Sequence, residues 1–148
     1  MQNELMHILL ADDDEDDRLF FKEAFEKIKI KTRVDMVNDG VELMDYLTRH
    51  GNILPHILFL DLNMPRKSGI DCLLELKRID HIKNIPIVIY STSASENDIE
   101  ETFVKGANVY LKKPSDFSTL KKTLEVVIAT NWQYHTSGLN RDNFLLSL

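Results

Sequence analysis

The stretch "HILLADDDEDDRLFF", from His7 to Phe21, joins a short apolar run to six consecutive acidic residues, Asp12 to Asp17. The apolar run has the composition of a buried strand, and the apolar residues that resume at Leu19 have helical spacing. Six like charges repel one another unless a helix N-terminus or a cation stabilises them. The stretch therefore predicts a strand followed by a helix, with an ionic site where the two meet.

Part of the acidic run is expected to begin the helix, with Asp14 as its cap and Asp17 three residues later, as in a capping box. A calcium-binding EF-hand loop over Asp12 to Glu23 is the alternative, because acids occupy its positions 1, 3, 5 and 12. However, Asp17 stands where the EF-hand needs glycine, and the preceding residues have the pattern of a strand rather than a helix. The sequence argues against this alternative.

The rest of the chain repeats the alternation of strand and helix. Short apolar runs predict strands at His7–Ala11, Thr32–Val37, His56–Leu60, Ile85–Tyr90 and Asn108–Leu111. The stretches between them are longer, and several carry apolar residues at helical spacing. These are Leu19, Phe20, Ala24, Phe25 and Ile28; Val41, Met44 and Leu47; and Phe117, Leu120, Leu124, Val127 and Ile128. Such alternation predicts an α/β fold, a doubly wound parallel sheet covered by helices on both faces.

The composition limits the function classes. The net charge of −6 disfavours binding to nucleic acid or to an anionic membrane surface. Apolar runs stay well short of the roughly 20 residues that span a bilayer, and the first residues lack the pattern of a signal peptide. The single cysteine, Cys72, cannot form an internal disulfide and is expected in the core on a helix. We therefore expect a cytoplasmic protein with no membrane and no nucleic-acid partner.

Chemically active side chains stand at the ends of four predicted strands. They are Asp12 and Asp13, Asp61, Ser91 and Thr92, and Lys113. In an open parallel sheet, sites form at the carboxyl ends of the strands, so these side chains should converge. Three carboxylates facing one lysine need a cation, and carboxylate oxygens suit Mg²⁺. Because no histidine or cysteine stands beside them, a zinc site is not expected.

These residues resemble the response-regulator receiver domain of two-component signalling, over about residues 5 to 130. Asp12 and Asp13 match the family's acidic pair, and Asp61 in "LFLDLNMP" matches its phosphoacceptor. Ser91 matches the switch hydroxyl and Lys113 the lysine before proline. The turn "NDG" and the stretch "KSG…IPIV" are most similar to single-domain regulators of the phytochrome-associated type. The resemblance implies a (βα)5 domain with the flavodoxin-like strand order 2-1-3-4-5.

The resemblance also implies the chemistry of the site. Asp61 would be the nucleophile that accepts a phosphoryl group from a histidine kinase or a phosphotransfer protein. Mg²⁺ would be held by Asp13 and Asp61, by Asp12 through water, and by the backbone carbonyl of Asn63. Lys113 would contact a phosphoryl oxygen. The protein would catalyse only its own phosphorylation and dephosphorylation, and would not be an enzyme in the usual sense.

Three further residues would carry the signal. The resemblance implies that Ser91 contacts the phosphoryl group and moves inward on phosphorylation, and that Tyr110 on the fifth strand follows. Thr92 would line the entrance of the site. The change would reshape the face formed by the fourth helix, fifth strand and fifth helix, and so alter binding to a downstream protein.

Two other function classes are the alternatives. Aspartyl-phosphate hydrolases of the haloacid-dehalogenase type also combine an aspartate, a hydroxyl, a lysine and acidic metal ligands. In that family the nucleophile lies on the first strand and the acidic pair comes late, whereas here Asp12 and Asp13 come first and Asp61 lies mid-chain. A degenerate receiver that serves only as an interaction module is disfavoured by the complete set of site residues.

We expect residues 1–130 to form the receiver domain and residues 131–148 a C-terminal extension, with no separate output domain. The extension is unusually apolar for a solvated terminus. Its large apolar residues are Trp132, Tyr134, Phe144, Leu145, Leu146 and Leu148. The extension would either fold back onto its own domain or, as we predict, extend the last helix's interface and form a homodimer.

Overall fold

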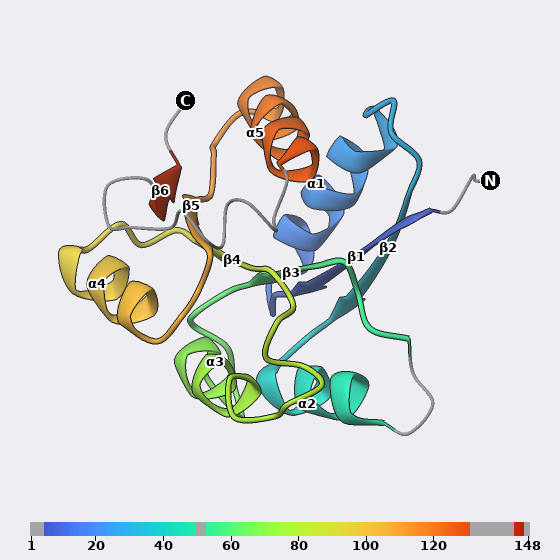
Figure 1. Cartoon of the computed structure of the whole chain (residues 1–148). Coiled ribbons are helices and arrows are strands. Elements are labelled where there is room, and N and C mark those ends of the chain that lie inside the picture. The colour runs from blue at the N-terminus through green and yellow to red at the C-terminus, as the bar shows by residue number, and fades with distance from the viewer. Residues whose placement is uncertain (1–4, 50–52, 131–143, 147–148) are drawn as a thin grey trace.

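The structure is a computed structural model that describes residues 5–49, 53–130 and 144–146. Strands and helices alternate along the chain (Figure 1). The strands are β1 (Met6–Ala11), β2 (Thr32–Val37), β3 (Ile57–Leu60), β4 (Ile87–Ser91), β5 (Val109–Lys112) and β6 (Leu145–Leu146). The helices are α1 (Glu15–Glu26), α2 (Gly40–Thr48), α3 (Gly69–Leu76), α4 (Glu96–Val104) and α5 (Phe117–Ala129). The five predicted strands are therefore confirmed within one or two residues at each end.

The strands form one parallel sheet in the order β2-β1-β3-β4-β5-β6. This confirms the predicted doubly wound sheet with the order 2-1-3-4-5 and adds a sixth strand at the β5 edge. Ala11 lies beside Leu60, and Ser91 beside Lys112, so the strands end at a common edge. Side chains that directly follow these strands are thereby brought together.

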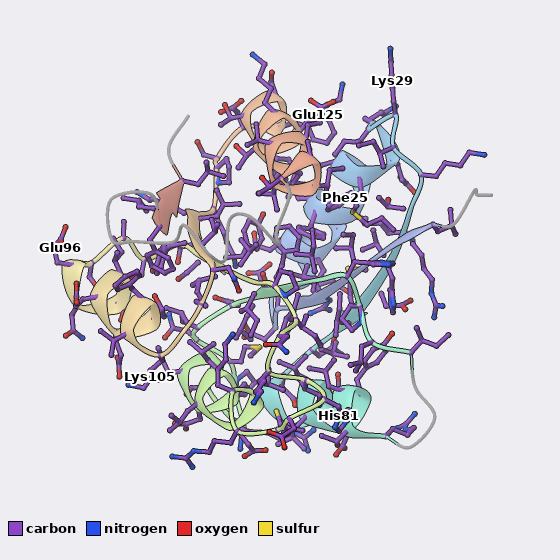
Figure 2. The ribbon with its side chains drawn as sticks, viewed as in Figure 1. Phe25, Lys29, His81, Glu96, Lys105 and Glu125 are labelled. Atoms are coloured by element: carbon purple, nitrogen blue, oxygen red, sulfur yellow. The ribbon has the colours of Figure 1, made fainter. Side chains whose placement is uncertain are left out.

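The helices cover both faces of the sheet, α1 and α5 on one and α2, α3 and α4 on the other (Figure 1). Phe25 lies between α1 and the sheet, whereas Lys29 and Glu96 point away from the molecule (Figure 2). Leu19 departs from the predicted apolar face of α1, because it is exposed while Phe21 is fully buried. The helix turns Phe21 towards Phe59 and Tyr90 of the sheet, which leaves Leu19 on the solvent side.

Each helix begins with a capping residue whose side chain accepts a hydrogen bond from the backbone N–H three residues later. These caps are Asp14, Asp39, Ser68, Ser95 and Asp116. The predicted cap at Asp14 is confirmed, because its carboxylate accepts the Asp17 N–H at 3.0 Å. The reciprocal half of the predicted capping box is not formed in this way, because the Asp17 carboxylate bonds Lys113 instead. An EF-hand would require a helix before the acidic run, but the strand β1 lies there. The structure therefore does not contain the EF-hand that was the alternative for this stretch.

Two further predictions concern packing. Cys72 is fully buried on α3, as predicted.

The second prediction concerns the C-terminal residues. Phe144 is also fully buried, and β6 pairs with β5 of the same chain. For residues 144–146 the structure thus shows the fold-back that was the disfavoured alternative. It is favourable because the apolar surface of Phe144 is removed from water between α4 and β5. Trp132, Tyr134 and Leu148 lie outside the described residues. None of the helices in the described ranges is long and apolar enough to cross a membrane.

Candidate functional site

Three carboxylates meet at the carboxyl edge of the sheet. Asp12 directly follows β1, Asp61 directly follows β3, and one oxygen each of Asp12, Asp13 and Asp61 lies within 4.8 Å of the others. The adjacency of β1 and β3 fixes this arrangement, because the Asp61 N–H donates to the Ala11 carbonyl at 3.0 Å. Asp12 and Asp61 are buried, whereas Asp13 is exposed. The cluster therefore has a buried floor and one side open to solvent.

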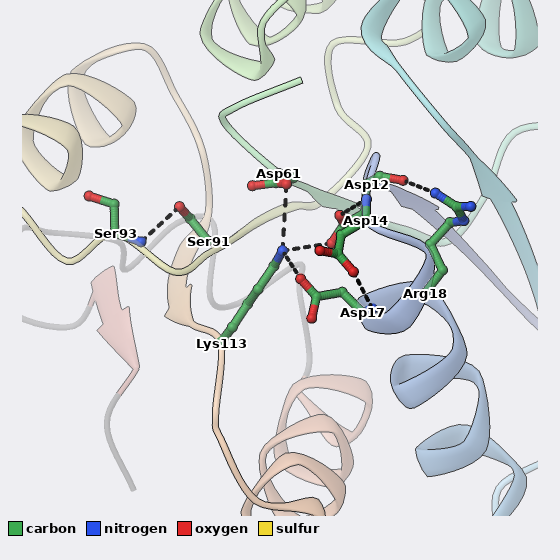
Figure 3. Close-up of polar contacts among 8 residues, drawn as sticks. All are labelled: Asp12, Asp14, Asp17, Arg18, Asp61, Ser91, Ser93 and Lys113. Carbon is green, nitrogen blue, oxygen red and sulfur yellow. Dashed lines mark hydrogen bonds and ion pairs between the residues drawn. The ribbon is translucent and has the colours of Figure 1, made fainter. Parts of the chain in front are cut away.

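Lys113 places its ammonium among these carboxylates (Figure 3). Its Nζ lies 2.8 Å from Asp12 Oδ2, 2.8 Å from Asp17 Oδ2 and 3.5 Å from Asp61 Oδ2. The Lys113 backbone N–H donates to the Ser91 carbonyl at 2.8 Å, which fixes the residue beside the end of β4. Nζ also lies 5.4 Å from the centre of the Tyr90 ring, a favourable position for a cation. One cation thus partly neutralises several acids from different elements.

Burial and charge shift the acidity of these groups. Burial raises the pKa of Asp61 to about 6, with Asp12 adding to the rise and Lys113 opposing it. Burial also raises the pKa of Asp12, and the contacts with Lys113 oppose this shift. For Lys113, burial alone would lower the pKa, but Asp12, Asp17 and Asp61 raise it overall. The lysine therefore stays charged, and one ammonium does not fully compensate the buried carboxylates.

The donor set fits a hard divalent cation. The clustered ligand atoms are all carboxylate oxygens, which are the ligands that Mg²⁺, Mn²⁺ and Ca²⁺ prefer. Asp12 Oδ1 accepts the Asp14 N–H at 3.0 Å, and its buried Oδ2 is paired with the Lys113 ammonium at 2.8 Å. Three clustered carboxylates still exceed the single charge of Lys113, and such an excess is costly unless a further cation compensates it. The exposed Asp13 leaves room for water ligands.

The predicted switch residues Ser91 and Tyr110 lie on the next two strands of the sheet, β4 and β5. Ser91 ends β4 and is fully buried, and its Oγ accepts the Ser93 N–H at 3.1 Å rather than facing Asp61 (Figure 3). Tyr110 is also fully buried, and its hydroxyl donates to the Ser93 carbonyl at 2.8 Å. Thr92 is exposed beside them. Ser93 therefore links the two predicted switch residues through its backbone.

The loop between β3 and α3 holds Asn63 close to Asp61. Asn63 is exposed, and its backbone N–H, with that of Leu62, donates to the Asp61 carboxylate and lowers its pKa against the effect of burial. Gly69 allows the loop to close, because a Cβ there would lie 2.1 Å from the Asp61 carbonyl oxygen. Arg66 has a left-handed backbone, with φ of 67°, and its guanidinium pairs with Asp39 at 3.0 Å.

Two residues of the site were missed from the sequence. Asp17 was treated only as part of the helix start, yet its carboxylate bonds Lys113 at 2.8 Å. Its position in the first turn of α1, shortly after the end of β1, is the sequence signal that could have suggested it. Ser93 was not singled out, and its role depends on backbone contacts to Ser91 and Tyr110 that leave no sequence signal.

Comparisons with known proteins agree with this geometry. The chain is 34% identical over 123 residues to the probable methanogenesis regulatory protein FilR2 of Methanothrix harundinacea, covering 81% of this chain and 79% of that protein. It is 30% identical over 122 residues to the response regulator Rcp1 of a Synechocystis strain, covering 80% of this chain and 83% of that protein.

Among solved structures, the phosphorylated cyanobacterial phytochrome response regulator RcpA matches with a TM-score of 0.78 at 31% identity, covering 84% of this chain and 91% of that one. The Mn²⁺-bound form of Rcp1 matches with a TM-score of 0.76 at 29% identity, covering 84% of this chain and 92% of that one. The family model described as "Response regulator receiver domain" matches residues 8–125. This range includes every strand end that forms the acidic site, so the chain belongs to the response regulator receiver domain family of two-component signalling.

Proposed function

We propose that Asp61 accepts a phosphoryl group from a histidine kinase or a phosphotransfer protein. The observation that carries this proposal is the cluster of Asp12, Asp13 and Asp61 within 4.8 Å, with the Lys113 ammonium 3.5 Å from Asp61. An acceptor carboxylate needs a cation to approach a phosphoryl group that is itself negatively charged. Lys113 provides one cation, and the acidic pair provides a site for a second.

The transfer follows from the position of Asp61. A carboxylate oxygen of Asp61 attacks the phosphorus of a phosphohistidine, an acyl phosphate bond forms, and the phosphorus–nitrogen bond breaks. The released imidazole takes a proton from solvent. The Lys113 ammonium contacts a phosphoryl oxygen and offsets the added negative charge. Hydrolysis reverses the state by attack of water on phosphorus, which returns Asp61 and inorganic phosphate.

Mg²⁺ is the cofactor that we propose for this site. Asp13 and Asp61 would hold it directly, Asp12 through water, and Asn63 through its backbone carbonyl. When bound, Mg²⁺ would neutralise charge on the carboxylates and on the phosphoryl oxygens. The cluster of three carboxylates around one lysine supports a cation here, as does the Mn²⁺-bound structure of the similar Rcp1.

The signal would pass through Ser91 and Tyr110. We propose that the Ser91 hydroxyl, which now accepts from the Ser93 N–H, turns to donate to a phosphoryl oxygen. Once Ser91 no longer holds the Ser93 N–H, the Ser93 backbone can move. The Tyr110 hydroxyl, which donates to the Ser93 carbonyl, then no longer has a fixed acceptor. Thr92, exposed beside Ser91, would line the entrance. The resulting change in the surface around β5 would alter binding to a downstream protein. We propose that the protein acts in the cytoplasm.

A labelling experiment tests the site. With Mg²⁺ and a small acyl-phosphate donor, the protein should gain one phosphate, measured by intact-protein mass spectrometry. Asp61→Asn should remain unlabelled, and chelation of the metal should abolish labelling. Asp16→Asn is the matched control, because Asp16 is an exposed acid of the same run and should leave labelling unchanged. Equal labelling of Asp61→Asn would contradict the assignment.

The same samples separate the receiver from a phosphohydrolase. A hydrolase would release many phosphates per protein from a phosphate monoester, whereas the receiver should release almost none. A protein that takes no phosphate from the acyl-phosphate donor, yet binds its partners, would instead be an interaction module.

A further inference from the structure

We call the C-terminal residues 144–146 the strap. They pack on the surface at which the proposed signal path from Asp61 ends. The Phe144 ring meets Phe103 of α4 at a centroid distance of 5.3 Å and Tyr110 of β5 at 6.2 Å, both edge to face. Phe144 has no exposed surface. Its side chain is therefore part of the core on the α4 side of the sheet.

The two residues that follow hold the edge of the sheet. Leu145 pairs with Tyr110 and Leu146 with Leu111, in parallel register. Leu146 packs with the core on the opposite face, under α1 and α5. The side chains of Phe144 and Leu146 thus pack on opposite faces of the sheet. Between them the strap lies along the edge of β5, the strand that carries Tyr110 (Figure 1). Without the strap, β5 would present an open edge to other chains.

A continuous series of contacts joins the strap to the acidic site. The Lys113 N–H donates to the Ser91 carbonyl, and Ser91 Oγ accepts the Ser93 N–H. The Ser93 carbonyl accepts from the Tyr110 hydroxyl, and the Tyr110 ring contacts Phe144. A displacement of Ser91 therefore reaches Phe144 through two hydrogen bonds and one ring contact.

We propose that the strap is an intramolecular cover of the surface formed by Phe103, Tyr110 and Leu111, and that phosphorylation releases it. The proposal rests on the proposed function, because the release begins with the movement of Ser91. In the unphosphorylated state Phe144 fits the observed position of Tyr110. When Tyr110 leaves Ser93, the shape that Phe144 fills is lost, and the strap equilibrium shifts towards the detached state. The uncovered β5 edge then becomes available to a partner only in the phosphorylated protein.

A fluorine NMR experiment tests the proposal on the full chain. Phe144 is replaced by 4-fluorophenylalanine, and beryllofluoride with Mg²⁺ serves as the phosphoryl mimic. Before the mimic is added, the ring fluorine should give one signal displaced from that of the urea-unfolded chain. After addition the signal should move towards the unfolded position. Fluorine bound as beryllofluoride gives its own resonance, so occupancy of Asp61 is read in the same spectrum.

Variants make the outcome specific. Asp61→Asn should show neither the beryllofluoride resonance nor the Phe144 shift. Ser91→Ala should bind beryllofluoride more weakly, because one donor to it is lost. At a concentration that saturates the site, judged from the bound resonance, it should still lack the Phe144 shift, because the link to Tyr110 is cut. Val104→Ala is the matched control, since this exposed α4 residue takes part neither in the ring contacts of Phe144 nor in the pairing of β5 with β6. Both signals should match those of the unaltered chain.

Three results would overturn the strap. Bound beryllofluoride with an unmoved Phe144 signal would leave the proposed function intact and refute the release. An absent beryllofluoride resonance in the unaltered chain would refute the proposed function and the release with it. A buried Phe144 signal that grows with protein concentration would place the strap on a second copy of the chain and refute the intramolecular cover.

Discussion

At the scale of single residues, the site is dominated by the cost of burying Asp61. Its carboxylate loses contact with water, and Lys113 at 3.5 Å offsets this only in part, so its pKa rises to about 6. The raised pKa means that the folded state holds a proton on Asp61 more tightly than the unfolded chain, whose aspartates titrate near 4. A cation bound beside Asp61 would remove this penalty, and the site is therefore built to gain from metal.

This acidity predicts a pH-dependent effect of Asp61→Asn. Because the charged form is the costly one in the fold, the metal-free protein should lose stability as the pH rises from about 4 to about 6. The variant lacks this titration, so it should be more stable than the unaltered chain by about 1–3 kcal/mol at pH 7, with no difference below pH 4. Urea unfolding in the presence of a chelator, repeated from pH 4 to pH 8, measures the difference.

Two controls accompany this measurement. Asp16→Asn removes an exposed acid from the same run and should show no such pH dependence. Addition of Mg²⁺ should reduce the advantage of Asp61→Asn, because we propose that the unaltered site binds the ion and expect the variant to bind it less well. A variant that is less stable than the unaltered chain at pH 7 without metal would show that Asp61 is not strained by burial.

At the scale of elements, the loop from β3 to α3 is shaped by close backbone contacts. A Cβ at Gly69 would lie 2.1 Å from the Asp61 carbonyl oxygen, and a Cβ at Gly40 would lie 2.1 Å from that of Lys67. Such distances are far inside van der Waals contact, so the loop or the helix must move if either glycine is replaced. The Arg66–Asp39 pair at 3.0 Å adds a second link between this loop and the start of α2.

We predict that Gly69→Ala and Gly40→Ala affect metal binding differently. Both should destabilise the fold by about 1–3 kcal/mol, as overpacking does. Only Gly69→Ala pushes against Asp61 itself, so it should weaken Mg²⁺ binding by about tenfold or more, whereas Gly40→Ala should have a much smaller effect. Calorimetric titration with Mg²⁺ and urea unfolding of both variants provide the comparison. Equal losses of Mg²⁺ affinity would indicate that the loop moves as one body.

At the scale of the whole molecule, the extension determines how the β5 edge is closed. In the homodimer predicted from the sequence, the apolar tail would extend the interface of the last helix, whereas in residues 144–146, the described part of the tail, Phe144 is buried within its own chain. We therefore expect the unphosphorylated protein to sediment as a monomer over a concentration series. A chain truncated after Thr130 should associate more strongly, because it exposes Phe103 and Tyr110. Association that instead weakens on truncation would favour the dimer.

The sequence by itself determined the order of elements and the main site. Apolar runs with turn residues between them were enough to predict β1 to β5, because strand and helix patterns depend on local spacing. The meeting of Asp12, Asp13 and Asp61 with Lys113 also followed, because residues after parallel strands must share an edge. These features depend on the periodicity of apolar residues and on the topology of the sheet, and both can be inferred from the sequence.

Only the tertiary structure decided which side chains fill particular contacts. Asp17 became a partner of Lys113, and Leu19 became exposed while Phe21 was buried, because the rotation of α1 about its axis is set by packing against the sheet and α5. Phe144 joined the core because α4 and β5 leave a space that an aromatic ring fills. Local sequence does not encode these choices, since each depends on the shape formed by segments far apart in the chain.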